Sequence, residues 1–80
     1  MFKNKNEDGS LNLCGSKIAK LRKSQNISQR ELADALQLLG LDLGKNAIQQ
    51  IESGKRFVTD IELKTIAQYF KIGIERLFEG

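Results

Sequence analysis

Residues 28–54 read SQRELADALQLLGLDLGKNAIQQIESG, and this stretch contains the strongest fold signals of the chain. At its start, Ser28 and Glu31 have the spacing of a capping box, in which each side chain bonds the backbone amide of the other residue. Apolar residues then recur at helical spacing, at Leu32, Ala33 and Leu36. The pattern therefore predicts a helix that begins just after Ser28.

A second helix is predicted at the other end of this stretch, over residues 45–53. At about 100° per residue, Ile48 and Ile51 share one face with Glu52. The opposite face carries polar side chains, at Asn46, Gln49, Gln50 and Ser53. Gly54 follows directly and can adopt the left-handed conformation that ends many helices. One side of this helix is thus suited to packing, and the other side is polar and rich in amides.

The connection between these two helices is rich in leucine and glycine. Its apolar and glycine residues are Leu38, Leu39, Gly40, Leu41, Leu43 and Gly44. Either the first helix continues to about Leu39, or the chain forms a small loop with Leu41 and Leu43 packed inward. In such a loop, Asp42 would compete with Gly44 as the cap of the next helix.

Three further helices are predicted outside this stretch. One begins at Gly15 and directs Ile18 and Leu21 inward. Another begins at a second capping box, formed by Thr59 and Glu62, and its apolar positions are Leu63, Ile66, Ala67 and Phe70. A last short turn would close the core with Ile74, Leu77 and Phe78. With no strand alternation and no repeats, the sequence predicts an all-α fold of five helices.

The chain of 80 residues is long enough for one compact domain. Residues 1–13 are polar and unpatterned, so we expect a flexible N-terminal arm followed by a domain over residues 14–80. The single cysteine, Cys14, cannot form an intramolecular disulfide, and the sequence has no secretory leader. These features predict a reducing, cytoplasmic setting.

Several classes of function are disfavoured by what the sequence lacks. It has no histidine, and Cys14 stands alone without the clustered spacing of a zinc site. It has no glycine-rich phosphate loop and no apolar run long enough to span a membrane. We therefore expect no catalytic residue, no metal, no cofactor, no small-molecule substrate and no membrane partner. Cys14 is interpreted as a small residue beside the first helix.

Positive charge is concentrated in the middle of the chain. Residues 15–58 contain eight basic and four acidic side chains, whereas the whole chain carries a net charge of +3. A net charge of this size does not identify a partner by itself. Its location favours a nucleic-acid partner for the central helices.

Together these elements resemble the Cro/repressor-type (XRE) helix-turn-helix family over residues 15–78. The matching pieces are IAKLR (18–22), ISQRELA (27–33), AIQQIESGKR (47–56) and ERLF (75–78). The resemblance implies a compact helical bundle of the lambda-repressor-like DNA-binding type. It also implies that the third helix lies in the major groove of double-stranded DNA, braced by the second helix.

Roles for individual residues follow from the resemblance together with the position and chemistry of each side chain. The residues expected to contact bases are Lys45, Asn46, Gln49 and Gln50, because amides pair with adenine and lysine pairs with guanine. The residues expected to contact phosphates are Gln29, Lys55, Arg56, Lys17 and Lys23. Arg22 and Glu52 occupy positions that commonly form a partly buried ion pair between the first and third helices. The chain departs from the common form in its connection between helices, which is about five residues longer than the usual short turn.

Two functions are compatible with these features. The first is a sequence-specific transcriptional regulator, a repressor by expectation, that binds a two-fold operator as a homodimer at least on DNA. Dimer contacts would come from the arm or the last helices, with Tyr69, Ile74 and Phe78 as apolar contributors. The second is a protein-interaction module, such as an antitoxin or anti-regulator, whose leucine-rich segment (residues 38–43) meets a partner.

Overall fold

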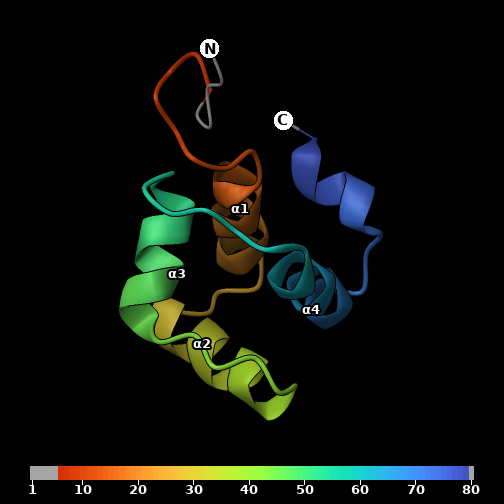
Figure 1. The fold of residues 1–80 in the computed structure, drawn as a ribbon. Coiled ribbons are helices and arrows are strands. Elements are labelled where there is room, and N and C mark those ends of the chain that lie inside the picture. Colours follow the sequence, from red (N-terminus) through yellow and green to blue (C-terminus); the bar gives the residue numbers. More distant parts are fainter. Residues whose placement is uncertain (1–5, 80) are drawn as a thin grey trace.

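The computed structural model describes residues 6–79, which form four α-helices and one short 3-10 helix, without a strand (Figure 1). The elements are α1 (Gly15–Ser24), α2 (Gln29–Leu38), α3 (Lys45–Glu52), α4 (Asp60–Phe70) and η1 (Ile74–Phe78). The prediction of an all-α fold is confirmed, but the count of five α-helices is not, because the last element is a 3-10 helix. No helix among residues 6–79 is long and apolar enough to cross a membrane.

Both predicted capping boxes are present and start α2 and α4. The Glu31 amide donates to Ser28 Oγ at 3.0 Å, and the Ser28 amide donates to Glu31 Oε1 at 2.8 Å. The corresponding distances between Thr59 and Glu62 are 3.2 and 3.0 Å. These bonds satisfy amides that have no partner within the helix, so both helices begin where the sequence predicts.

Every helix contributes to one hydrophobic core. Its largest fully buried aliphatic side chains are Ile18, Leu32, Leu36, Ile48, Ile51, Ile66 and Leu77. η1 contributes Leu77 alone, whereas Ile74 and Phe78 remain 39% and 46% exposed. The expectation that all three residues close the core is therefore wrong for Ile74 and Phe78. In a 3-10 helix residues three positions apart share a face, so Phe78 lies off the face that carries Leu77, whereas Ile74 is on that face at the start of η1 and is partly exposed.

The long connection between α2 and α3 combines the two alternatives left open by the sequence. α2 continues to Leu38, and Gly40 then reverses the chain at a φ of 92°. Leu41 is half-buried and Leu43 is buried, so the following loop packs against the core. Gly44 rather than Asp42 occupies the cap position of α3, and it supplies no side-chain hydrogen bond.

Residues 6–13, part of the expected N-terminal arm, form hydrogen bonds among themselves and with the rest of the fold. Asn6 donates to the carbonyl of Asn12 at 2.9 Å, and the Leu11 amide donates to the carbonyl of Gly54 at 2.8 Å. The Asn12 side chain bonds α1 and the end of α3. The remainder of the expected arm, residues 1–5, lies outside the described residues.

α1 and α3 approach each other closely at Gly15. A Cβ atom at this position would overlap the backbone carbonyl oxygen of Ile51 and would lie 2.9 Å from Asn12 Oδ1. The overlapping atom belongs to the backbone, so relief requires the two helices to separate. The sequence marked Gly15 as a helix start, and the structure adds that only glycine permits this contact.

We expect Gly15→Ala to lower the free energy of unfolding by at least about 2 kcal/mol, because the added methyl group forces α1 away from α3. Urea denaturation followed by circular dichroism measures this change. Gly44→Ala is the matched control, since no heavy atom lies within 4 Å of the Cβ position at Gly44. A loss for Gly15→Ala no larger than that of the control would contradict the close-approach argument.

Candidate nucleic-acid interface

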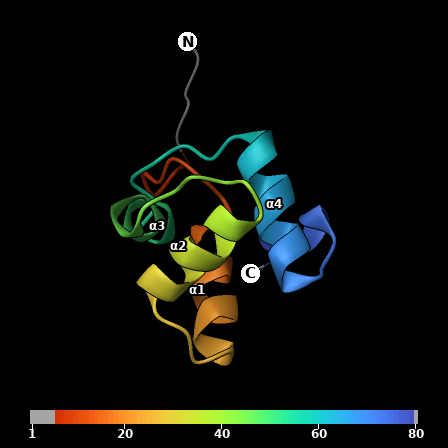
Figure 2. The same ribbon diagram turned by 90° about the horizontal axis from the view of Figure 1, so that it is seen from below.

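The outward face of α3 is polar and exposed. Its exposed residues are Lys45, Asn46, Gln49 and Gln50, the four residues expected to contact bases. Ile48 and Ile51 anchor the opposite face, with exposed fractions of 1% and 0%. Both views of the fold place α3 at the periphery, on the other side of the molecule from η1 (Figures 1 and 2). The chain therefore leaves this face open to a partner.

An ion pair between Arg22 and Glu52 joins α1 to the end of α3, as the family resemblance implies. Arg22 Nε lies 2.7 Å from Glu52 Oε2, and Arg22 Nη2 lies 3.0 Å from Oε1. The two side chains are only 11% and 8% exposed. Hydrogen bonding to Glu52 raises the pKa of Arg22. A paired fork of this kind fixes the relative orientation of two helices.

Gln29 extends this ion pair to the start of α2. Its Nε2 donates to Glu52 Oε1 at 3.0 Å, so one carboxylate holds residues from α1 and α2. Arg22 Nη1 also donates to the carbonyl of Ile27 at 2.8 Å, which ties down the turn before α2. We call Arg22, Gln29 and Glu52 the polar clasp. It places Gln29, a candidate phosphate contact, beside the last turn of α3.

Lys55 and Arg56 follow α3 but differ in their surroundings. Lys55 is exposed. The Arg56 guanidinium forms two bonds to the Glu62 carboxylate, at 2.9 and 3.0 Å, and a third to the carbonyl of Phe57 at 3.0 Å. Most of the hydrogen-bonding capacity of Arg56 is therefore used within the protein. Lys55 is the residue of this turn whose charge is open to solvent.

Glu62 has a second role that the sequence prediction did not include. The residue was identified as half of a capping box, and that role is confirmed. Its carboxylate also pairs with Arg56, and this hydrogen bond is the main cause of its lowered pKa. The capping-box pattern spans three residues and therefore does not include Arg56, which lies six positions before Glu62.

The other two candidate phosphate contacts lie on α1. Lys17 is half-buried in the first turn, and Lys23 is exposed in the last turn, next to Arg22 of the polar clasp. Lys23 is thus nearer in sequence to Gln29, the candidate phosphate contact at the start of α2. Both lysines therefore lie outside the exposed polar face of α3.

Cys14 is buried at the start of α1, as its interpretation as a small structural residue requires. Burial raises the pKa of its thiol to about 11, which keeps it protonated and unreactive near neutral pH. Within residues 6–79, no group of three or more cysteine, aspartate or glutamate side chains could hold a metal ion.

Comparison with known families gives one match. The profile of a helix-turn-helix family matches residues 18–77, from within α1 to η1. The match includes the polar clasp, the exposed face of α3 and the turn that carries Lys55. No curated protein and no solved structure matches the chain.

The Arg56–Glu62 pair makes stability depend on pH in a defined direction. Because the folded state lowers the pKa of Glu62 from 4.5, the pair's contribution is present above about pH 4.5 and is lost as pH falls through the folded value. We expect Glu62→Gln to lower the free energy of unfolding by about 1–2 kcal/mol at pH 7, and by less at pH 3. Urea denaturation at both pH values measures the difference.

Glu31→Gln is the control, since it changes the corresponding capping-box carboxylate of α2, which is exposed. A deficit for Glu62→Gln that stays constant between pH 7 and pH 3 would contradict the proposed linkage.

Proposed function

The chain belongs to the XRE-type helix-turn-helix family, and from this premise we propose that it is a transcriptional regulator that binds a specific sequence of double-stranded DNA. The observation that carries the proposal is the exposed polar face of α3, anchored from behind by Ile48 and Ile51. An α-helix fits the width of the major groove, where each base pair presents a distinct pattern of donors and acceptors.

We propose that α3 reads bases through its four exposed residues, Lys45, Asn46, Gln49 and Gln50. The amides of Asn and Gln can donate to and accept from the edge of adenine, and the ammonium group of Lys45 can donate to the two acceptors of guanine. Lys45 stands in the first turn of α3. The N-terminal residues of a recognition helix are the ones that reach farthest into the groove.

The sugar-phosphate backbone would be contacted on both sides of this helix. Gln29, held by Glu52 at the start of α2, supplies a fixed polar contact, and exposed Lys55 supplies charge after α3. Lys17 and Lys23 add positive charge from α1. Arg56 contributes chiefly by holding the turn through Glu62, so we assign the charge of this turn toward DNA to Lys55.

A homodimer on a two-fold operator, acting as a repressor in the cytoplasm, completes the proposal. One domain presents one reading helix, and a two-fold pair would place its helices in successive major grooves, about 34 Å apart. Ile74 and Phe78 of η1 are large, partly exposed apolar residues that could form such an interface. Tyr69 is half-buried and packs edge-on against Phe70, so it contributes less. This function requires no cofactor, metal or catalytic residue.

A protein-interaction module is the second candidate, favoured by the end of α2. Leu38 is 89% exposed and Leu39 is 44% exposed, which is unusual for two adjacent leucines. Leu41 and Leu43 pack inward, so only Leu38 and Leu39 of this leucine-rich segment offer a large apolar surface to a partner. Selection of bound duplexes from a random DNA pool separates the two functions, because an interaction module enriches no sequence.

On a duplex enriched in this way, we expect Gln50→Ala to weaken binding by about 1–3 kcal/mol and to relax the preference at one base position. Lys55→Ala should weaken binding to all duplexes alike and should reduce the salt dependence by about one phosphate contact. Mobility shifts on selected and scrambled duplexes at several salt concentrations measure both effects. An equal loss on every duplex for Gln50→Ala would count against base reading by this residue.

A further inference from the structure

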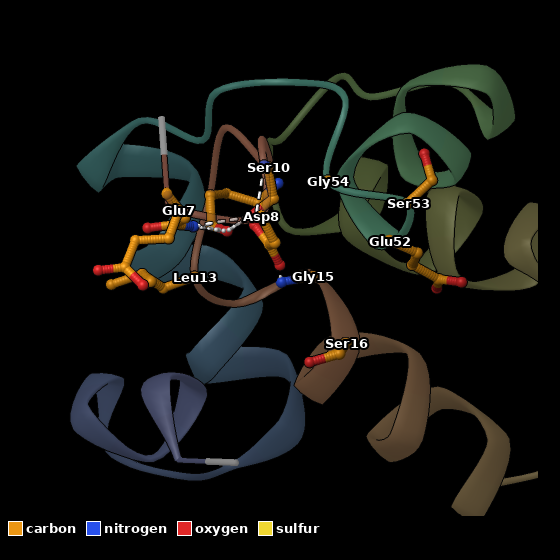
Figure 3. Close-up of a pocket in the computed structure, with 11 residues that line it drawn as sticks. Glu7, Asp8, Ser10, Leu13, Gly15, Ser16, Glu52, Ser53 and Gly54 are labelled. Atoms are coloured by element: carbon orange, nitrogen blue, oxygen red, sulfur yellow. Dashed lines mark hydrogen bonds between the residues drawn. The ribbon is translucent and has the colours of Figure 1, made fainter. Parts of the chain in front are cut away.

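The segment before α1 holds the turn that follows α3. Three backbone carbonyls near the end of α3 accept bonds from it: those of Ile51, Gly54 and Arg56. The segment is itself braced, because Asn6 donates to the Asn12 carbonyl and Asp8 accepts from Ser10. Figure 3 shows residues of this segment beside Ser53 and Gly54, around a shallow hollow that they line together with the start of α1.

Asn12 is the residue on which these contacts converge. Its Nδ2 donates to the Ile51 carbonyl at 3.1 Å and to the Arg56 carbonyl at 2.8 Å. Its Oδ1 accepts from the Gly15 amide at 2.8 Å. Both ends of the amide are therefore used, one to start α1 and the other to bind the end of α3 and its turn. A neutral amide is the side chain of this size that can donate twice and accept once.

The turn held in this way, residues 53–56, carries Lys55. The Lys55 amide donates to the Gln50 carbonyl at 2.8 Å, and Gly54 has a φ of 78°, so the backbone reverses sharply. The approach of the segment is close enough that a Cβ atom on Gly54 would lie 2.8 Å from Ser10 Cβ. The backbone of Lys55 is thus fixed on both sides while its side chain faces solvent.

We propose that Asn12 is a positioning residue for DNA binding: its amide fixes the turn of residues 53–56 so that Lys55 meets the DNA backbone in one arrangement. This inference rests on the proposed function. When the amide is lost, the turn samples other arrangements, and binding must select the competent one. The apparent dissociation constant rises by the reciprocal of the competent fraction.

Asn12→Asp is the informative variant because it separates the two roles of Asn12. The aspartate keeps an oxygen that accepts from the Gly15 amide, but it places a carboxylate oxygen against the carbonyls of Ile51 and Arg56. Ser16→Asp is the matched control: it adds the same charge at an exposed position in the first turn of α1, beside the same hollow (Figure 3). It removes neither bond of Nδ2.

Amide hydrogen exchange of the free protein tests the first step without DNA. We expect Asn12→Asp to speed exchange at Lys55 by about tenfold relative to exchange at Ile66, which lies buried in α4. Ser16→Asp should leave this ratio unchanged. Equal rates at Lys55 in the wild type and in Asn12→Asp would overturn the proposal, because the turn would not depend on the amide.

Binding to the selected duplex, with and without Lys55→Ala, tests the second step. We expect Asn12→Asp to weaken binding about tenfold when Lys55 is present and less than twofold in the Lys55→Ala background, since both changes then act on one contact. Both measurements are made well below the unfolding temperature of each variant, so loss of fold does not contribute. Ser16→Asp should change the affinity by less than twofold in either background.

Besides equal exchange rates at Lys55, two binding results would overturn the positioning role while leaving the proposed function intact. The first is that the wild type and the Asn12→Asp variant bind the duplex with equal affinity. The other is a loss of the same size in both backgrounds, which would assign the effect to charge or global stability. If the wild type enriches no duplex at all, the proposed function fails and the positioning role fails with it, whereas hydrogen exchange still reports whether Asn12 holds the turn.

Discussion

Burial of Ile48 and Ile51 is the constraint on which the proposed interface depends. Two aliphatic side chains on one face of an eight-residue helix fix its rotation, because turning the helix would expose both to water. With the rotation fixed, the amide-bearing face has to point outward. The helix has few internal hydrogen bonds, so its orientation comes from packing more than from helix propensity.

Rotation alone does not fix the tilt or the end of α3, and polar contacts provide these. The polar clasp gathers α1 and the start of α2 around Glu52, in the last turn of α3. Asn12, which precedes the opposite end of α1, binds the carbonyl of Ile51 within that turn and the carbonyl of Arg56 in the turn that follows. Buried ionic and amide contacts add little net stability because desolvation offsets much of their attraction. They exclude arrangements that leave their groups unpaired.

The features that the sequence predicted involve residues that are close together along the chain. Capping boxes span three residues and the face of α3 spans one helix, so local patterns carry them. The Asn12–Arg56 bond joins residues 44 apart, and no periodicity encodes it. The family resemblance supplied the Arg22–Glu52 pair, which is 30 residues apart. The path of the long connection was left open, since it depends on how far Leu41 and Leu43 reach into a core that other helices build.

Charge in the central region is divided between scaffold and surface according to side-chain type. Two of its three arginines, Arg22 and Arg56, form forked pairs with carboxylates, for which the planar guanidinium is suited. Lys45 and Lys55 are exposed at the two ends of α3, where a compact mobile charge can meet phosphates or base edges. Because carboxylates neutralise these two arginines, counting them as charge available to DNA would be misleading. The charge at the proposed interface would therefore come chiefly from lysines, and among these Lys55 lies in a turn that Asn12 holds through the carbonyl of Arg56.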